Sequence, residues 1–244
     1  MLNYSIIHTS WRPLTNEAMK QVDLAYLEQL QQNADWLPGS EQIFAAFSLA
    51  LPKTNYILFG ESPYPRAQSA NGYAFWDSAV HELWSPNGLS KEVNRATSLR
   101  NFIKMLLLAE GLLSDTDTSQ SAIAALDKEN LVSTVDELFE NFQRQGILLL
   151  NASLVLSKKP VVQDAKCWRP FLNTLLNSLA KKYANLELIL LGNIAKVIAQ
   201  LPSANQFKQF HAEHPYNISF IYNKEVQAFF KPMRLLRKKN QSVT

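Results

Sequence analysis

In the first third of the chain, the segment Asn55-Tyr56-Ile57-Leu58-Phe59-Gly60 runs directly into Glu61-Ser62-Pro63-Tyr64-Pro65. A short apolar run that ends on glycine is typical of a buried β-strand, and the proline-containing continuation is typical of a loop. Three more segments follow the same plan: 146–150 ends at Asn151, 186–191 ends at Gly192, and the weaker 206–212 ends close to His214. The sequence therefore predicts four short strands, each ending in a polar or glycine-containing segment.

Helical patterns lie before and between these strands. Apolar residues recur at helical spacing in six segments, namely 16–32, 40–49, 96–113, 133–145, 168–183 and 195–201. The polar segment 114–121 is predicted to be a loop. Because strands that alternate with helices favour parallel pairing with helices on both faces, we predict an α/β fold: a three-layer α/β/α sandwich around a four-stranded parallel sheet.

Length and composition describe an ordinary globular protein. With 244 residues, 47% hydrophobic and 18% charged, the chain is predicted to form one domain over 1–244. No apolar run approaches the length of a transmembrane helix, so no membrane partner is expected. The N-terminal residues lack the pattern of a signal peptide, which predicts a cytoplasmic protein.

The single cysteine, Cys167, excludes an internal disulfide and any metal or iron–sulfur site built from several thiolates. We therefore expect no metal and no cofactor. The net charge of +3 is compatible with a polyanionic partner but does not select one. The basic residues Arg234, Arg237, Lys238 and Lys239 are interpreted as a solvated end of the chain.

The four strand ends are expected to meet, because ligands of open α/β sheets bind outside the carboxyl ends of the strands. Each end alone is weak support for a site, since glycine and asparagine commonly close strands and a lone histidine is usually structural. Other segments carry further motifs, which are Leu37-Pro38, Ile43–Phe47, Asn71–Phe75, Ser98–Asn101, Leu148–Ala152, His214-Pro215, and Ala228–Phe230 followed by Asn240.

In order and spacing, these segments resemble the uracil-DNA glycosylase superfamily, whose first motif reads Gly-Gln-Asp-Pro-Tyr-His after a strand. The resemblance runs from about Trp11 to Asn240. It implies a monomeric enzyme that binds DNA, flips uracil out of the helix and hydrolyses its N-glycosidic bond without a cofactor.

The resemblance also implies a role for individual residues. Phe75 would stack on the flipped base, and the Asn151 amide would pair with the uracil edge, which cytosine presents reversed. Tyr64 would exclude the methyl group of thymine. Neutral His214 would donate a hydrogen bond that stabilises negative charge on uracil O2.

DNA contacts follow in the same way from the resemblance. Ser98 and Ser219, with backbone amides near Gly192, would hold phosphates. Ile218 would replace the leucine that fills the vacated base stack. Alternatively, 218–222 forms another short strand or packs on a partner.

Three positions depart from the family motif. Ser62 stands where the family has the aspartate that orients the attacking water, Glu61 replaces its glutamine, and Pro65 replaces its histidine. Reduced or altered catalysis is therefore expected. Two alternatives stay open: a catalytically silent member that binds DNA or a protein partner, and a glycosylase for another damaged base that Glu61 reads.

Overall fold

The computed structural model describes residues 2–33, 35–183 and 185–239. The chain divides into two compact units, Met1–Ser78 with Gly146–His211 and Ala79–Gln145 with Ala212–Thr244. The expectation of one domain over 1–244 stays a prediction. Within the described ranges, no helix combines the length and the apolar character needed to cross a membrane. Asn240, which the closing motif included, lies outside the described residues.

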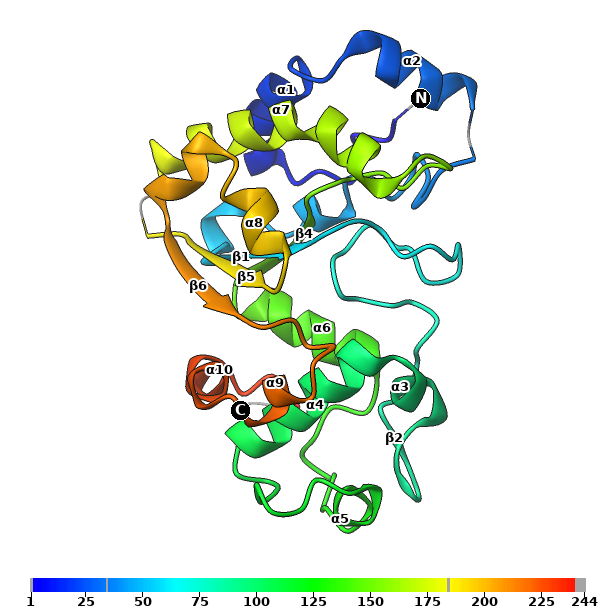
Figure 1. Ribbon diagram of the computed structural model, residues 1–244, viewed down its shortest axis with the longest axis vertical. Coiled ribbons are helices and arrows are strands. Elements are labelled where there is room, and N and C mark those ends of the chain that lie inside the picture. Colours follow the sequence, from blue (N-terminus) through cyan, green and yellow to red (C-terminus); the bar gives the residue numbers. More distant parts are fainter. Residues whose placement is uncertain (1, 34, 184, 240–244) are drawn as a thin grey trace, which may run out of the picture. The chain divides into compact units, whose positions relative to one another are not determined.

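The first unit is built on a four-stranded sheet with the order β4-β1-β5-β6 (Figure 1). Its strands are β1 (Tyr56–Gly60), β4 (Ile147–Asn151), β5 (Glu187–Leu191) and β6 (Lys208–Ala212). β1 pairs in parallel with both β4 and β5, and Gly60 lies opposite Asn151. Every residue of β4 and β5 is buried, as is usual for central parallel strands. The four predicted strands are confirmed.

Helices of the same unit cover the sheet. They are α1 (Arg12–Met19), α2 (Leu24–Gln32), α7 (Val161–Ala180) and α8 (Ile194–Ile198). α1 and α7 lie side by side (Figure 1). Beneath them, the rings of Trp11, Phe47, Phe171 and Trp168 form a chain of edge-on contacts with centroid distances of 5.3, 6.2 and 5.6 Å. This buried aromatic layer anchors the helices to the sheet.

Two helix predictions in the N-terminal part were wrong. The segment 16–32 forms two helices instead of one, because Asp23 caps α2 by accepting a hydrogen bond from the Tyr26 amide. The segment 40–49 forms turns and the 3₁₀ helix η2 (Ala45–Ser48), not an α-helix. Its residues 43–47 are all buried, so this segment lacks the solvent-facing side of an amphipathic helix.

α7 begins at Val161, earlier than the predicted start at Trp168. The cause lies in its first turn, where the buried Asp164 carboxylate accepts hydrogen bonds from the amide and hydroxyl of Ser157 at 2.8 Å each. Tyr26 also donates to this carboxylate, at 2.9 Å. Charge-assisted bonds of this kind fix the chain at the helix start.

The second unit is mainly helical. Its elements are the β2 (Trp84–Ser85) and β3 (Gly88–Leu89) hairpin, α3 (Lys91–Arg95), α4 (Thr97–Ala109), α5 (Gln120–Ala124), α6 (Val135–Arg144), η5 (Lys231–Met233), α9 (Ser219–Tyr222) and α10 (Lys224–Phe230). Phe102 of α4 stands at the centre of its core. The rings of Phe142, Phe220 and Phe230 lie 5.6, 5.5 and 5.1 Å from that of Phe102.

The helix predicted over 133–145 is confirmed, because Thr134 and Glu137 form a capping box at the start of α6. α5 begins inside the predicted loop 114–121, where Ser119 caps it. The interpretation of the C-terminal basic residues as a solvated end was wrong for Arg237. Its guanidinium contacts the nearly buried Glu110 carboxylate at 2.9 Å.

Candidate active site at the strand ends

The ends of β1 and β4 are held together beyond the strands themselves. The Ala152 amide donates to the Gly60 carbonyl at 2.8 Å, and the Ser153 amide donates to the Glu61 carbonyl at 2.9 Å. Gly60 leaves room for the neighbouring asparagine. A Cβ built at Gly60 would collide with Asn151 Oδ1 and would lie 2.8 Å from the Ala74 Cβ. The Asn151 side chain therefore occupies the space that a larger residue at 60 would fill.

Asn151 carries the clearest sign of a binding role. The residue is 2% exposed, and its side-chain Nδ2 has no hydrogen-bond partner among the residues that the structure describes. A buried donor without a partner costs about 1–3 kcal/mol, so such groups are rare in a folded protein unless a ligand satisfies them. The strand end thus presents an amide N–H that is ready for an acceptor.

Phe75 is brought to the same strand end. The Ala74 amide donates to the Leu149 carbonyl of β4 at 3.1 Å, which ties the segment to the sheet two residues before Asn151. Phe75 has φ +65°, in the left-handed region, and the Tyr64 hydroxyl donates to its carbonyl at 3.1 Å. A non-glycine residue in this region costs on the order of 1–3 kcal/mol, and such strain is concentrated at functional sites.

Tyr64 is held as a neutral phenol. Burial, and then the nearby Asp77 carboxylate, raise the pKa of Tyr64 above its ordinary value of 10.0. The Arg66 guanidinium contacts the Asp77 carboxylate at 3.2 Å. The phenol keeps its proton at neutral pH and remains a donor to Phe75.

Two of the three altered motif positions, Glu61 and Ser62, directly follow Gly60 at the end of β1. Glu61 is exposed and Ser62 is half-buried. Within the described ranges, the only hydrogen bond of the Ser62 hydroxyl is a long one of 3.4 Å to the Pro63 carbonyl. A hydroxyl does not carry the negative charge of a carboxylate. The carboxylate nearest to Ser62 in the sequence belongs to Glu61, which is exposed to solvent.

The end of β5 contributes a turn. Gly192 has φ +78°, and its carbonyl accepts a hydrogen bond of 3.2 Å from the Ala195 amide at the start of α8. A glycine is suited to this left-handed position. Gly192 is half-buried.

His214 belongs to the second unit and follows the end of β6 by two residues. Its Nδ1 accepts a hydrogen bond of 3.1 Å from the Tyr216 amide. Because a backbone amide only donates, Nδ1 carries no proton, and the neutral ring bears its proton on Nε2. The loop thereby fixes the tautomer that the predicted role of His214 requires.

Asn101 of α4 clamps this loop, and the sequence-based reasoning did not assign it a role. Its buried Nδ2 donates to the carbonyls of Pro215 and Tyr216 at 2.8 and 3.2 Å. Ser98 lies three residues earlier on α4, on the same side of the helix, and is half-buried. The sequence shows only that an asparagine follows a candidate phosphate-binding serine by three residues, which does not identify the loop as its partner.

Ile218 and Ser219 differ in what they offer to a ligand. Ile218 is 72% exposed and the nearby Tyr216 is 66% exposed, so two large apolar side chains project from this loop. The Ser219 hydroxyl donates to the Glu213 carboxylate instead. The alternative of a strand over 218–222 was wrong, because Ser219–Tyr222 forms the short helix α9.

The predicted site residues thus fall into two groups. Glu61, Ser62, Tyr64, Phe75 and Asn151 gather at the ends of β1 and β4, with Gly192 at the end of β5. The second unit brings together the start of α4 and the 214–219 loop. That the two groups form one pocket stays a prediction. Among the described residues, no three His, Cys, Asp or Glu side chains are grouped so as to hold a metal ion.

These features are those of an α/β protein with a parallel sheet that presents polar side chains at its carboxyl edge. No family profile matches the chain. It is similar to the wild-type UNG crystal structure from Nitratifractor salsuginis, with 47% sequence identity, a TM-score of 0.92, and coverage of 96% of this chain and 94% of the other. It is 28% identical to a uracil-DNA glycosylase of Amoebophilus asiaticus over 86% of this chain and 84% of that protein.

A mimivirus uracil-DNA glycosylase shares the fold, with a TM-score of 0.57 at 16% identity over 86% of this chain and 70% of the other. The extent and identity of the Nitratifractor match show that the chain belongs to the uracil-DNA glycosylase superfamily. The predicted three-layer α/β/α fold is confirmed by the same match.

Proposed function

We propose that this protein removes uracil from DNA by hydrolysis of the N-glycosidic bond, at a reduced rate because Ser62 replaces a carboxylate. The observation that carries the proposal is the buried, unpartnered Nδ2 of Asn151 at the strand end. The family to which the chain belongs, and the names of its relatives, supply the substrate class. DNA containing uracil is therefore the proposed partner, and the reaction needs no cofactor.

Base selection follows from the chemistry of the amide. Nδ2 of Asn151 donates to the uracil O4 carbonyl while Oδ1 accepts from N3–H. Cytosine presents a donor and an acceptor in the opposite order, so it would leave both partners unsatisfied. Phe75 stacks on the flipped ring, and Tyr64 occupies the space that the thymine methyl group would need.

The departing uracil gains negative charge as the glycosidic bond breaks. A neutral His214 with its proton on Nε2 is suited to donate to O2, where this charge collects. Its Nδ1 is already engaged by the Tyr216 amide, so the ring does not have to change tautomer during the reaction. Asn101 holds the backbone of this loop and acts as a positioning residue.

The attacking water receives weaker help than in a site with a carboxylate. Ser62 supplies no negative charge to steady the cationic sugar and is a poor base at neutral pH. The absence of one positioned general base costs roughly 10²- to 10⁴-fold in rate. We therefore propose slow turnover, with the pocket retained.

Phosphate contacts come from the loops around the pocket. Ser98 at the start of α4 and the backbone beside Gly192 are proposed to hold the strand. Ile218, exposed at the tip of its loop, is proposed to fill the gap left by the flipped base. The Ser219 hydroxyl has to leave Glu213 before it reaches a phosphate, so its contribution is the smallest of these.

A base-release assay tests this proposal. Single- and double-stranded oligonucleotides containing uracil, hypoxanthine, xanthine or an oxidised pyrimidine are incubated with excess protein, and free base is measured. We expect uracil alone to be released, and Asn151→Ala to abolish release while the matched surface variant Asn205→Ala retains it. Binding without release of any base would support the silent DNA binder, and release of another base instead of uracil would support recognition by Glu61.

A further inference from the structure

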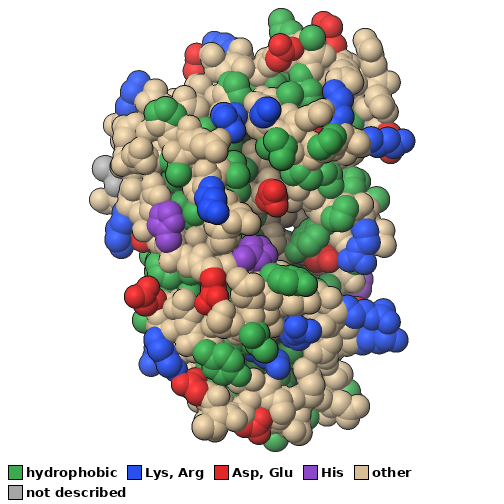
Figure 2. All heavy atoms as spheres, viewed as in Figure 1, with side chains coloured by type: hydrophobic (Ala, Val, Ile, Leu, Met, Phe, Trp, Pro, Cys, Tyr) green, Lys and Arg blue, Asp and Glu red, His purple; other side chains and the backbone are tan. Residues whose placement is uncertain are grey.

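A basic surface lies in the second unit, formed by the C-terminal segment and the end of α6. Over the face drawn in Figure 2, cationic and anionic side chains are interspersed. The basic surface is different: two adjacent hollows of about 510 and 580 Å³ share Arg234 and Arg237 in their walls. Their charged lining consists of one carboxylate, Glu110, and six cations, which are Arg144, Lys231, Arg234, Arg237, Lys238 and Lys239.

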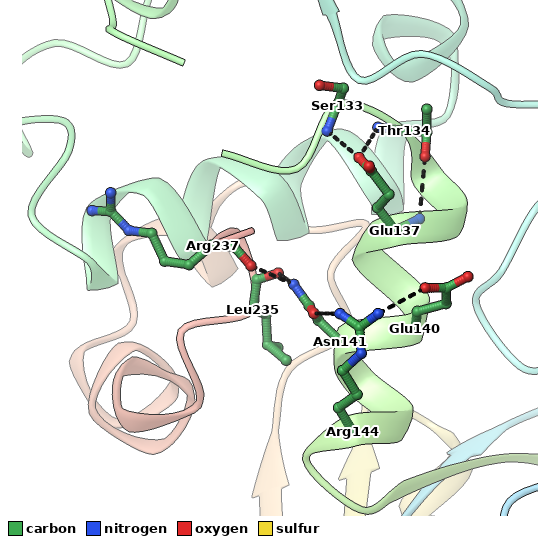
Figure 3. A network of polar contacts seen from close by, with 8 residues as sticks. All are labelled: Ser133, Thr134, Glu137, Glu140, Asn141, Arg144, Leu235 and Arg237. Carbon is green, nitrogen blue, oxygen red and sulfur yellow. Dashed lines mark hydrogen bonds and ion pairs between the residues drawn. The ribbon is translucent and has the colours of Figure 1, made fainter. Parts of the chain in front are cut away.

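The backbone that carries these cations is fixed by buried polar groups. Asn141 Nδ2 donates to the carbonyls of Leu235 and Arg237 at 2.9 and 2.8 Å, and Arg144 donates to Asn141 Oδ1 at 2.8 Å (Figure 3). Glu110 accepts from the Leu236 amide at 3.2 Å and from Arg237. The surface is therefore preorganised, which lowers the ordering cost of binding a ligand.

Three of the six cations remain available. Arg144 and Arg237 are paired with Glu140 and Glu110, and Lys238 donates to a backbone carbonyl. Among the described residues, no hydrogen-bond or ion-pair partner is present for the side chains of Lys231, Arg234 and Lys239. All three side chains are exposed. Among the residues that the structure describes, these three positive charges are therefore not neutralised by a partner.

Arg234 also has an unusual backbone. Its φ of +49° and ψ of +47° lie in the left-handed region, where glycine is the usual residue. Strain of this kind points to a function when the side chain makes no internal contact that explains it. A glycine would relieve the strain at Arg234, but it would remove the guanidinium from the wall between the two hollows.

The basic surface is separate from the loop that carries His214. Asn101 contacts that loop near the start of α4, whereas Glu110 caps the other end of the same helix. Nine residues of α-helix span about 13 Å. The surface therefore belongs neither to the predicted phosphate contacts at Ser98 nor to the 214–219 loop.

We infer that this basic surface binds the phosphate backbone of DNA, as a second contact that does not read the target base. The inference rests on the proposed function for its ligand. Guanidinium groups fit phosphate oxygens in a bidentate manner. A protein partner fits less well, because protein interfaces rely on buried aromatic and apolar anchors. None of the exposed large hydrophobic residues in the described ranges lines either hollow.

The test compares two variants with the same change in net charge. One carries Lys231→Gln, Arg234→Gln and Lys239→Gln, and its matched control carries Lys53→Gln, Lys181→Gln and Lys182→Gln on exposed positions of the first unit. Affinity for a uracil-free duplex is measured by fluorescence anisotropy between about 50 and 200 mM salt. Affinity falls with salt, and each lost phosphate contact makes the slope of log affinity against log salt concentration less steep by about 0.9. The slope of the first variant should therefore be less steep than that of the parent by about 2 to 3.

Single-turnover uracil release at saturating protein provides the second measurement. We expect the first variant to bind the duplex at least tenfold more weakly at low salt but to release uracil at the parent rate. Arg234→Gly should weaken binding without lowering the melting temperature, which separates loss of charge from loss of folding. A slope and an affinity equal to those of the control variant would overturn the inference, even if uracil release confirmed the proposed function. A reduced slope in a protein that releases no uracil would support the inference and refute the proposed function.

Discussion

Gly60→Ala is a small change with a large expected effect on uracil release. The backbone of Gly60 has a negative φ, so alanine is compatible with its conformation and the effect is steric. The added methyl would collide with Asn151 Oδ1 and lie 2.8 Å from the Ala74 Cβ. Overpacking of this kind costs about 1–3 kcal/mol. Alanine is favoured over glycine within a strand by about 0.5–1 kcal/mol, which offsets part of the loss.

Asn151 is expected to move because its amide is the easiest neighbour to displace. A misplacement of about 1 Å at a reacting site costs on the order of 10²-fold in rate. We therefore expect uracil release in single turnover to fall by about 10²-fold, with a drop in melting temperature of only about 2–8 °C. The loss of activity should greatly exceed what the loss of stability explains.

A second substitution separates the two neighbours of Gly60. Ala74→Gly removes the Cβ at 2.8 Å but leaves the collision with Asn151 in place. The double variant Gly60→Ala with Ala74→Gly should recover part of the melting temperature and little of the activity. If Gly60→Ala released uracil at the parent rate, the contact between Gly60 and Asn151 would not position the amide, and the reasoning would be refuted.

Two further predictions concern stability and the His214 loop. Because burial raises the pKa of Tyr64 above 10.0, its neutral phenol stabilises the fold fully below about pH 10, and this contribution is lost as the pH rises further. Between about pH 8 and 11, the free energy of unfolding measured with urea should fall less steeply with pH in Tyr64→Phe than in the parent protein. Equal slopes for the two proteins would contradict this. Asn101→Ala removes both clamps on the loop and should cost about 1–3 kcal/mol. Hydrogen exchange at 216 and 217 should accelerate, and unchanged exchange would mean that Asn101 does not hold the loop.

The strands could be predicted because their signal is local. Three runs of four or five buried, mostly apolar residues end at or directly before a glycine or an asparagine, and they form β1, β4 and β5. The signal for β6 is weaker, because its residues are mainly polar and none of them is fully buried. The helices were harder because their ends depend on single side chains. The Asp23 cap divides one periodic stretch into α1 and α2, and the buried Asp164 extends α7 toward the N-terminus.

The site was predicted in part, for a related reason. Asn151, Phe75 and Tyr64 follow strands or motifs that the sequence displays, and the structure brings them to one strand end. Asn101 could not be assigned a role from the sequence alone, because its partners are backbone carbonyls 114 and 115 residues away. The strain at Phe75 and Arg234 was equally invisible, since neither residue type indicates a left-handed backbone.

Uracil release by the parent chain and by the variant Glu61→Gln with Ser62→Asp shows whether this pocket excises uracil. Both proteins are measured in single turnover on the same uracil-containing duplex, with His214→Ala as the control for an inactive pocket. We expect measurable but slow release by the parent chain and an increase of about 10²-fold or more in the variant, because a carboxylate is restored beside the sugar. A variant that folds and binds DNA but still releases no uracil, with an equally inactive parent, would contradict the claim that this pocket excises uracil.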